Sequence, residues 1–196
     1  MYEFRRDIRC KLVCTALLDL ERLSEQGEID LLYGDQSRVS LQPYIPYAWQ
    51  FTDEKVGLPS TSGGGMNCFA LLSRDNHCIF EVTEENITAH WMSERLDRLS
   101  LSVKRLTVVV LDNARIHTKA VKDRGAVWQE RGLFVWFLPP YSPELNITEI
   151  LWRKLKYEWL RAEDYANKET LRLAVTQALA AVGASLRIQF KQAKMV

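Results

Sequence analysis

The run Leu106-Thr-Val-Val-Val-Leu111, followed directly by Asp112, decides the fold class of this 196-residue chain. A continuous apolar run rich in β-branched residues predicts a strand that is covered on both faces, as in parallel α/β sheets. A polar helix is expected over 116–131, ended by Gly132, and Leu133–Leu138 is a second run of the same kind. The alternation favours two parallel strands joined by a crossover helix.

The rest of the chain predicts further strands and helices in the order of a mixed sheet. Ile29–Asp35 alternates as a strand does, and Met66–Leu72 and Cys78–Thr83 flank a turn, as hairpin strands do. Helical spacing of apolar residues predicts helices over 3–26, 84–99, 145–160 and 169–182. The Pro-rich stretch 42–65 is expected to be a loop, with a strand near 47–51. We therefore expect the α/β class, with a helix over 1–27 leading into one domain over 28–196.

Composition excludes several classes of protein. The chain is 47% hydrophobic, which is ample for a packed core, and its 26 basic residues nearly balance its 25 acidic ones. A polyanion-seeking or disordered chain is therefore excluded, whereas a local basic face is not. No apolar run approaches the roughly 18 residues that a membrane span needs. The four cysteines form no C-x-x-C pair, which favours free thiols in a reducing intracellular compartment.

Three acids stand where strands or helices end or begin. Asp112 follows a buried strand, where open α/β sheets place their ligands, although an Asx turn or a helix cap explains it equally well. Glu149 lies early in the helix over 145–160, opposite an aliphatic stripe, and Arg153 and Lys156 flank it. Its alternatives are a capping box with Asn146 or a solvated charged face. Asp35 ends the first strand, where a turn beside Gly34 is the alternative.

Taken together, the three acids suggest a metal site. Parallel strands bring Asp112 and the helix that carries Glu149 to the same end of the sheet, and a neighbouring first strand would add Asp35. Two carboxylates about 4 Å apart repel by roughly 4 kcal/mol at an effective dielectric constant of 20, so protons or cations must neutralise them. All-oxygen ligands suit Mg²⁺ or Mn²⁺, and a two-metal site suits in-line phosphoryl displacement.

Several strings of sequence resemble a known family. Leu111-Asp-Asn-Ala-Arg-Ile-His117, Leu138-Pro-Pro-Tyr-Ser-Pro-Glu-Leu-Asn146 and Glu149-Ile-Leu-Trp-Arg-Lys-Leu-Lys156 are similar to DDE transposases of the mariner superfamily, and more closely to the bacterial insertion-sequence 630 family. Gly27–Gln36 and Pro43-x-x-Pro-x-x-x-Trp49 resemble that family's first catalytic strand and the loop after it. The resemblance runs from about 24 to 190.

The resemblance implies an RNase H-like fold, with a mixed five-stranded sheet flanked by helices. It implies that Asp35, Asp112 and Glu149 are catalytic and bind a pair of Mg²⁺ or Mn²⁺ ions. The implied reaction is hydrolytic nicking at transposon ends, followed by attack of a 3′-hydroxyl on target DNA at TA. One departure is Gln36, where the family usually has Glu.

A second departure concerns DNA recognition. Members of the family normally carry helix-turn-helix domains before the catalytic domain, so we expect this chain to be the half encoded by a second reading frame, working as a homodimer or with an upstream-frame recognition half. Its contacts to double-stranded DNA are then expected from a basic set without sequence specificity: Arg115, His117, Arg153, Lys154 and Lys156. His117 has helix-start packing as its alternative. We expect a bacterial cytoplasmic protein associated with the nucleoid.

Two other functions remain open at this point. The chain could be a remnant or regulator that binds DNA without cutting it, or a general RNase H-like nuclease. Metal-dependent strand transfer would separate a transposase from a nuclease, and DNA binding without cleavage would indicate a regulator.

Overall fold

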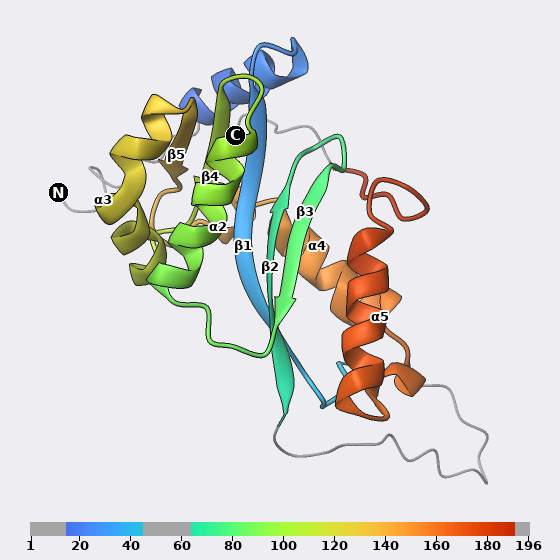
Figure 1. The fold of residues 1–196 in the computed structure, drawn as a ribbon. Helices are drawn as coiled ribbons and strands as arrows, with labels where there is room; N and C mark the ends of the chain where they lie inside the picture. The colour runs from blue at the N-terminus through green and yellow to red at the C-terminus, as the bar shows by residue number, and fades with distance from the viewer. Residues whose placement is uncertain (1–14, 45–63, 191–196) are drawn as a thin grey trace, which may run out of the picture.

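A five-stranded mixed sheet forms the centre of the computed structural model, which describes residues 15–44 and 64–190 (Figure 1). The strand order is β3-β2-β1-β4-β5, in which β1 and β2 as well as β2 and β3 are antiparallel, while β4 runs parallel to β1 and β5 parallel to β4. The strands are β1 (Asp30–Ser40), β2 (Gly65–Leu72), β3 (Cys78–Thr83), β4 (Thr107–Leu111) and β5 (Leu133–Phe137). This confirms the expected hairpin followed by parallel crossovers.

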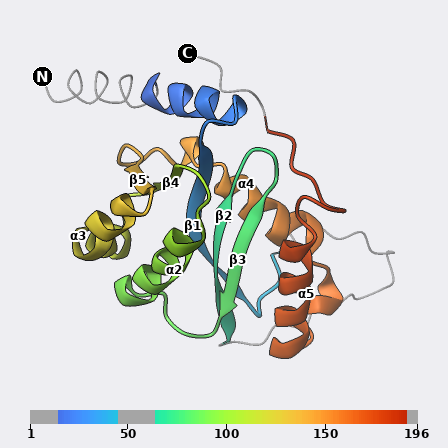
Figure 2. The same ribbon diagram turned by 45° about the horizontal axis from the view of Figure 1, so that its top comes forward.

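Helices cover both faces of the sheet. The helices α2 (Ala89–Ser102) and α3 (Arg115–Glu130) lie on one face, and α4 (Thr148–Lys154) and α5 (Lys168–Ala180) lie on the other (Figure 2). A further helix over 15–25 lies across the end of the sheet at which β1 begins. Within the described residues, no helix has both the length and the apolar character needed to cross a bilayer.

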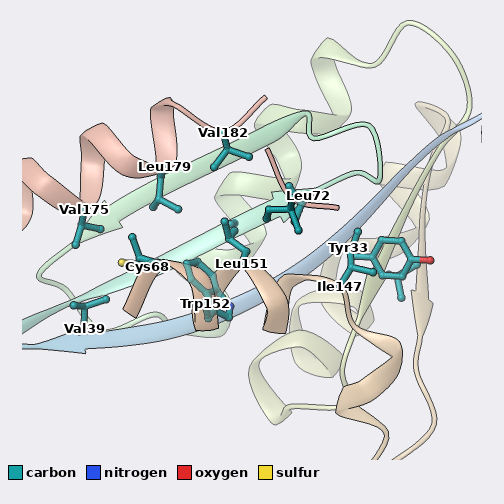
Figure 3. Close-up of a cluster of buried hydrophobic side chains, with 14 of the residues drawn as sticks. Tyr33, Val39, Cys68, Leu72, Ile147, Leu151, Trp152, Val175, Leu179 and Val182 are labelled. Carbon is teal, nitrogen blue, oxygen red and sulfur yellow. The ribbon is translucent and has the colours of Figure 1, made fainter. Parts of the chain in front are cut away.

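Two apolar clusters hold these layers together, and alternate residues of one strand enter different clusters. Leu31 and Tyr33 of β1 belong to the cluster beneath α4 and α5, whereas Leu32 belongs to the cluster beneath α2 and α3. This is the two-residue periodicity of a strand that is buried on both faces. Figure 3 shows the first cluster, in which side chains of α4 and α5 meet Cys68 and Leu72 of β2.

The chain is helical over most of 145–160, as expected, but the expectation of one continuous α-helix is wrong. The segment begins with a 3-10 turn at Pro143–Leu145, continues as α4, and ends in a π-helical turn at Leu155–Trp159. In that turn the Leu160 N–H donates to the Leu155 carbonyl (3.1 Å). The wider turn keeps both leucines in the interior, since Leu155 is 0% and Leu160 6% exposed.

Smaller differences concern boundaries. The helix expected over 84–99 begins only at Ala89, because the Thr88 hydroxyl accepts the Trp91 N–H (3.2 Å) and caps the first turn. The expected helix stop at Gly27 is confirmed, and its φ of +75° is a conformation that glycine adopts without strain. Residues 3–14 of the first expected helix and the strand expected near 47–51 lie outside the described residues.

Candidate active site

Asp35 and Asp112 lie just beyond the residues that pair β1 with β4. Tyr33 of β1 is the register partner of Val110 of β4, and each acid lies two residues further along the chain. Asp112 directly follows β4 as expected, whereas the expectation that Asp35 ends its strand is wrong, because β1 continues to Ser40 by pairing with β2. Because side chains alternate along a strand, both acids continue the face of Tyr33 and Val110, which is the face packed by α4. The sheet therefore carries both carboxylates at one edge, with the strands about 4.8 Å apart.

Glu149 reaches the same edge because the start of α4 is anchored to β1. The buried Asn146 amide donates to the Gly34 carbonyl (3.1 Å), directly before Asp35, and its Oδ1 accepts the Thr148 N–H (3.2 Å). One turn into the helix, Trp152 Nε1 donates to Asp35 Oδ2 (3.0 Å). Asn146, two residues before α4, and Trp152, three residues after Glu149, are thus both hydrogen-bonded to β1.

Asp35 and Glu149 line one cleft of about 310 Å³. The cleft also contains two basic side chains, an indole and a tyrosine pair, and the full set of lining residues is Asp35, Gln36, Ser37, Tyr44, Glu149, Trp152, Arg153, Lys156 and Tyr157. Tyr44 and Tyr157 meet edge to face with their ring centroids 6.0 Å apart. Acidic and basic side chains therefore share a concave surface beside the second half of β1.

The capping-box alternative for Glu149 is not what the structure contains. The Asn146 N–H donates to the Pro143 carbonyl (2.9 Å), so it is not available to the Glu149 carboxylate. Within the described part of the chain, that carboxylate accepts no hydrogen bond, and the residue is exposed at the cleft. The aliphatic stripe expected opposite Glu149 is confirmed, because Ile147, Leu151 and Leu155 are all buried.

The pKa of Asp35 is shifted by its burial and by the charges of the two other acids. Burial raises the pKa of Asp35, and the negative charges of Glu149 and Asp112 raise it further. The Gln36 N–H and the Trp152 indole oppose this shift, but the pKa still reaches about 6. No lysine or arginine in the described residues forms an ion pair with Asp35, so its charge is left without a protein cation.

Such a cluster fits a divalent cation, because uncompensated carboxylates are hard oxygen ligands. Within the described residues, no three acidic, histidine or cysteine side chains already stand in a ligating arrangement. Asp35 is held by Trp152, whereas the Glu149 carboxylate is exposed and has room to turn towards an ion.

Asp112 is held differently from Asp35. Its Oδ1 accepts the Ala114 N–H (3.0 Å) and a hydrogen bond from His117 Nδ1 (2.6 Å). The hydrogen bond from His117 lowers the pKa of Asp112; burial opposes the shift, and the Ala114 N–H adds to it. The carboxylate is therefore ionised at neutral pH while half of its side-chain surface remains exposed.

The basic residues expected to contact DNA are not equivalent. Arg153 and Lys156 line the cleft, and Lys156 Nζ lies 5.1 Å from the centre of the Tyr44 ring. Arg115 is exposed at the first position of α3, and Lys154 is engaged by Glu158 (2.7 Å). His117 is 0% exposed, so in this conformation its ring cannot reach DNA, and the structure corrects that expectation.

The sequence does not reveal the roles of two residues of the site. Its pattern predicts Asn146 only as a helix cap and assigns no role to Trp152, although both lie in the strings that resemble the family. Their partners are 112 and 117 positions away in the chain, so no local spacing could identify them. An indole three residues after an acid on a short helix was the available signal for Trp152.

Comparison with known proteins gives a consistent result. The family model for the DDE superfamily endonuclease matches residues 30–172. No curated protein sequence matches the chain.

Solved structures of one transposase resemble the fold. The Mos1 strand transfer complex has a TM-score of 0.56 at 17% identity, over 90% of this chain and 59% of that one. The Mos1 mariner paired-end complex with Mn has a TM-score of 0.52 at 15% identity, over 93% of this chain and 63% of that one. The corresponding complex with Mg has a TM-score of 0.53 at 17% identity, over 92% and 61%. The chain thus spans about three fifths of the length of these transposase chains, and the likeness identifies an RNase H-like catalytic-core fold.

Proposed function

Since this chain belongs to the DDE superfamily endonuclease family, we propose that it is the catalytic core of a DNA transposase that cuts and joins DNA strands with divalent metal ions. The observation that carries the proposal is the placement of Asp35 and Glu149 in one cleft, with Asp112 directly after the adjacent strand β4 and no lysine or arginine of the described residues in an ion pair with Asp35. Three carboxylates in that state are suited to holding cations against phosphate.

In the proposed reaction the three carboxylates would hold two Mg²⁺ or Mn²⁺ ions, which activate a nucleophilic oxygen and stabilise the leaving oxygen of a phosphodiester. Trp152 keeps the Asp35 carboxylate in place through its indole N–H. Asn146 fixes the start of α4 against β1, and with it the position of Glu149.

The basic side chains of the cleft would neutralise DNA phosphates. Arg153 and Lys156 share the cleft with Asp35 and Glu149, and Arg115 is exposed at the start of α3, close in sequence to Asp112. Phosphate contacts of this kind position a duplex without reading its sequence and weaken as salt rises. We therefore expect binding of double-stranded DNA that is sensitive to salt and insensitive to sequence.

The finer assignments are part of the same proposal. The chain would belong to the insertion-sequence 630 group and act on transposon ends and TA target sites. It would work as a homodimer or with a helix-turn-helix half from an upstream frame, at the bacterial nucleoid. The similar Mos1 structures are named as paired-end and strand transfer complexes and as complexes with Mn and Mg. The strings at Leu111–His117 and Leu138–Asn146 support the narrower family.

The test is nicking of supercoiled plasmid in Mn²⁺, Mg²⁺ or EDTA, comparing the wild type with Asp112→Asn. We expect metal-dependent nicking in the wild type and its loss in the variant. The matched control is Glu130→Gln, an exposed acid at the far end of α3, roughly 22 Å along the helix from Arg115.

Each outcome has a defined meaning. Nicking that survives Asp112→Asn would contradict the proposed site. DNA binding without nicking, even after a recognition half is supplied, would favour the regulator. Nicking without joining of a pre-cut end to target DNA would favour the general nuclease.

A further inference from the structure

A completely buried histidine lies behind one of the three acids. His117 is in the first turn of α3, is 0% exposed, and places Nδ1 2.6 Å from Asp112 Oδ1. An apolar side chain could fill this buried position at a much lower free-energy cost than an imidazole. A histidine here therefore indicates a polar role. Its contact with Asp112 is the only hydrogen bond that it makes within the described residues.

The two oxygens of Asp112 have different surroundings. Oδ1 accepts two hydrogen bonds, from His117 Nδ1 and from the Ala114 N–H (3.0 Å). Oδ2 accepts none from the described part of the chain. A carboxylate fixed through one oxygen cannot rotate freely, so the other oxygen keeps a constant direction.

The protonation of His117 follows from the same contacts. The carboxylate of Asp112 only accepts, so Nδ1 must carry a proton. Nε2 is buried and has no partner among the described residues. The contact with Asp112 therefore makes His117 Nδ1 the donor and Asp112 Oδ1 the acceptor.

We infer that His117 is a positioning residue which, together with the Ala114 N–H, occupies Oδ1 of Asp112 and leaves Oδ2 as the single oxygen open to a divalent cation. This rests on the proposed function, because it concerns how one member of the proposed metal site is oriented. Partners that hold a metal-binding carboxylate in this way typically change metal affinity by about 10–100-fold when they are lost.

The test measures Mn²⁺ affinity directly, by titration followed through the electron paramagnetic resonance signal of free Mn²⁺. His117→Phe keeps a ring but removes the donor, and we expect affinity to fall about 10-fold or more. His117→Asn offers an amide N–H near the position of Nδ1, and we expect it to recover much of the loss. His90→Asn, at an exposed site on α2, is the matched control and should leave affinity unchanged.

A second variant removes the other hydrogen bond to Asp112 Oδ1 and leaves the histidine unchanged. Ala114 has a φ of −56°, which proline also adopts, so Ala114→Pro removes the N–H with little change of backbone. We expect it to weaken Mn²⁺ binding as well. Unchanged affinity in His117→Phe and Ala114→Pro, with the fold intact by circular dichroism, would overturn the inference.

The wild-type protein supplies a measurement that does not depend on any variant folding. Nitrogen-15 NMR of the imidazole should show a proton on Nδ1, and an Nδ1 without a proton would overturn the inference. Mn²⁺ binding distinguishes a failure of the proposed function from a failure of the role of His117. Absence of Mn²⁺ binding in the wild type would contradict the proposed function. Equal Mn²⁺ affinity in the wild type and in His117→Phe would contradict only the role of His117.

Discussion

Two carboxylates of this molecule receive an indole N–H and yet lie in opposite electrostatic surroundings. Asp97, between α2 and α3, accepts Trp128 Nε1 (2.7 Å) and is also bonded by Arg124 (3.0 Å and 3.1 Å). Asp35, at the edge between β1 and α4, accepts Trp152 Nε1 (3.0 Å) but has Asp112 and Glu149 as its charged neighbours.

The pKa values of the two groups move in opposite directions. Burial acts to raise the pKa of both; for Asp97 the hydrogen bonds from Arg124 and Trp128 outweigh it and the pKa falls. For Asp35 the neighbouring acids add to burial, and the pKa rises to about 6. The protein neutralises Asp97 with its own cations and leaves the charge of Asp35 to a partner from solution. This separates a carboxylate that stabilises the fold from one that is available for chemistry.

Asp35→Asn is expected to give the largest effect and to reveal this difference. Metal-dependent nicking should fall by about 100-fold or more, since a metal ligand contributes several kcal/mol to the transition state. Without metal at pH 7.5, the free energy of unfolding should instead rise by about 1–2 kcal/mol, a value reduced for partial solvent exposure. Plasmid nicking and urea unfolding measure the two effects.

The gain in the free energy of unfolding of Asp35→Asn should grow as the pH rises. The folded-state pKa of about 6 lies above the ordinary value of 3.8, so the charged form of Asp35 is penalised in the native state. The penalty develops as the pH rises from about 4 to 6 and is complete above about pH 7. Wild type and Asp35→Asn should therefore be equally stable near pH 4. A variant that is less stable at pH 7.5 would mean that the charge of Asp35 is compensated.

Asp97→Asn should act in the opposite sense. Removing this charge leaves Arg124 and Arg131 without their acid at the contact of α2 with α3, and we expect a loss of about 2 kcal/mol at pH 7. Because the folded-state pKa is lowered, this stabilisation is present above the ordinary value and lost as the pH falls through the folded one. Urea unfolding at pH 7 and at pH 3 checks both statements. An equal loss at both pH values would contradict the ion-pair explanation.

Binding of Mn²⁺ should also distinguish Asp35 from Asp97, with a smaller effect on the free energy of unfolding. Mn²⁺ at ten times its dissociation constant should stabilise the wild type by about 1.4 kcal/mol. Asp97→Asn is less stable without metal, but Mn²⁺ should raise its free energy of unfolding by the same amount as in the wild type. In Asp35→Asn the rise on adding Mn²⁺ should be much smaller. Thermal unfolding with and without Mn²⁺ measures the increments. An equal increment in Asp35→Asn would place the cation elsewhere.

Much of the fold could be predicted from local pattern. The apolar runs around Val109 and Val135 predict two strands, and the spacing of Ile147, Leu151 and Leu155 predicts which face of α4 is buried. The expected cover on both faces is confirmed for β4 but wrong for β5, because β5 is an edge strand and is only partly buried. The π-helical turn and the short extent of α4 could not be predicted, because they depend on how Leu160 fits the interior. Propensity alone favours continuing the helix.

The positions of Asp112 and Glu149 and the strand face of Asp35 were determined by the sequence alone, because the two-residue and 3.6-residue periodicities are local properties of the chain. The extension of β1 beyond Asp35 depends on its pairing with β2. Only the tertiary structure decided what each acid touches. Asp35 meets an indole 117 positions away, and His117, five residues after Asp112, is turned inward by packing rather than outward to DNA. Charge compensation is a non-local property, so the difference between Asp35 and Asp97 exists only in the folded molecule.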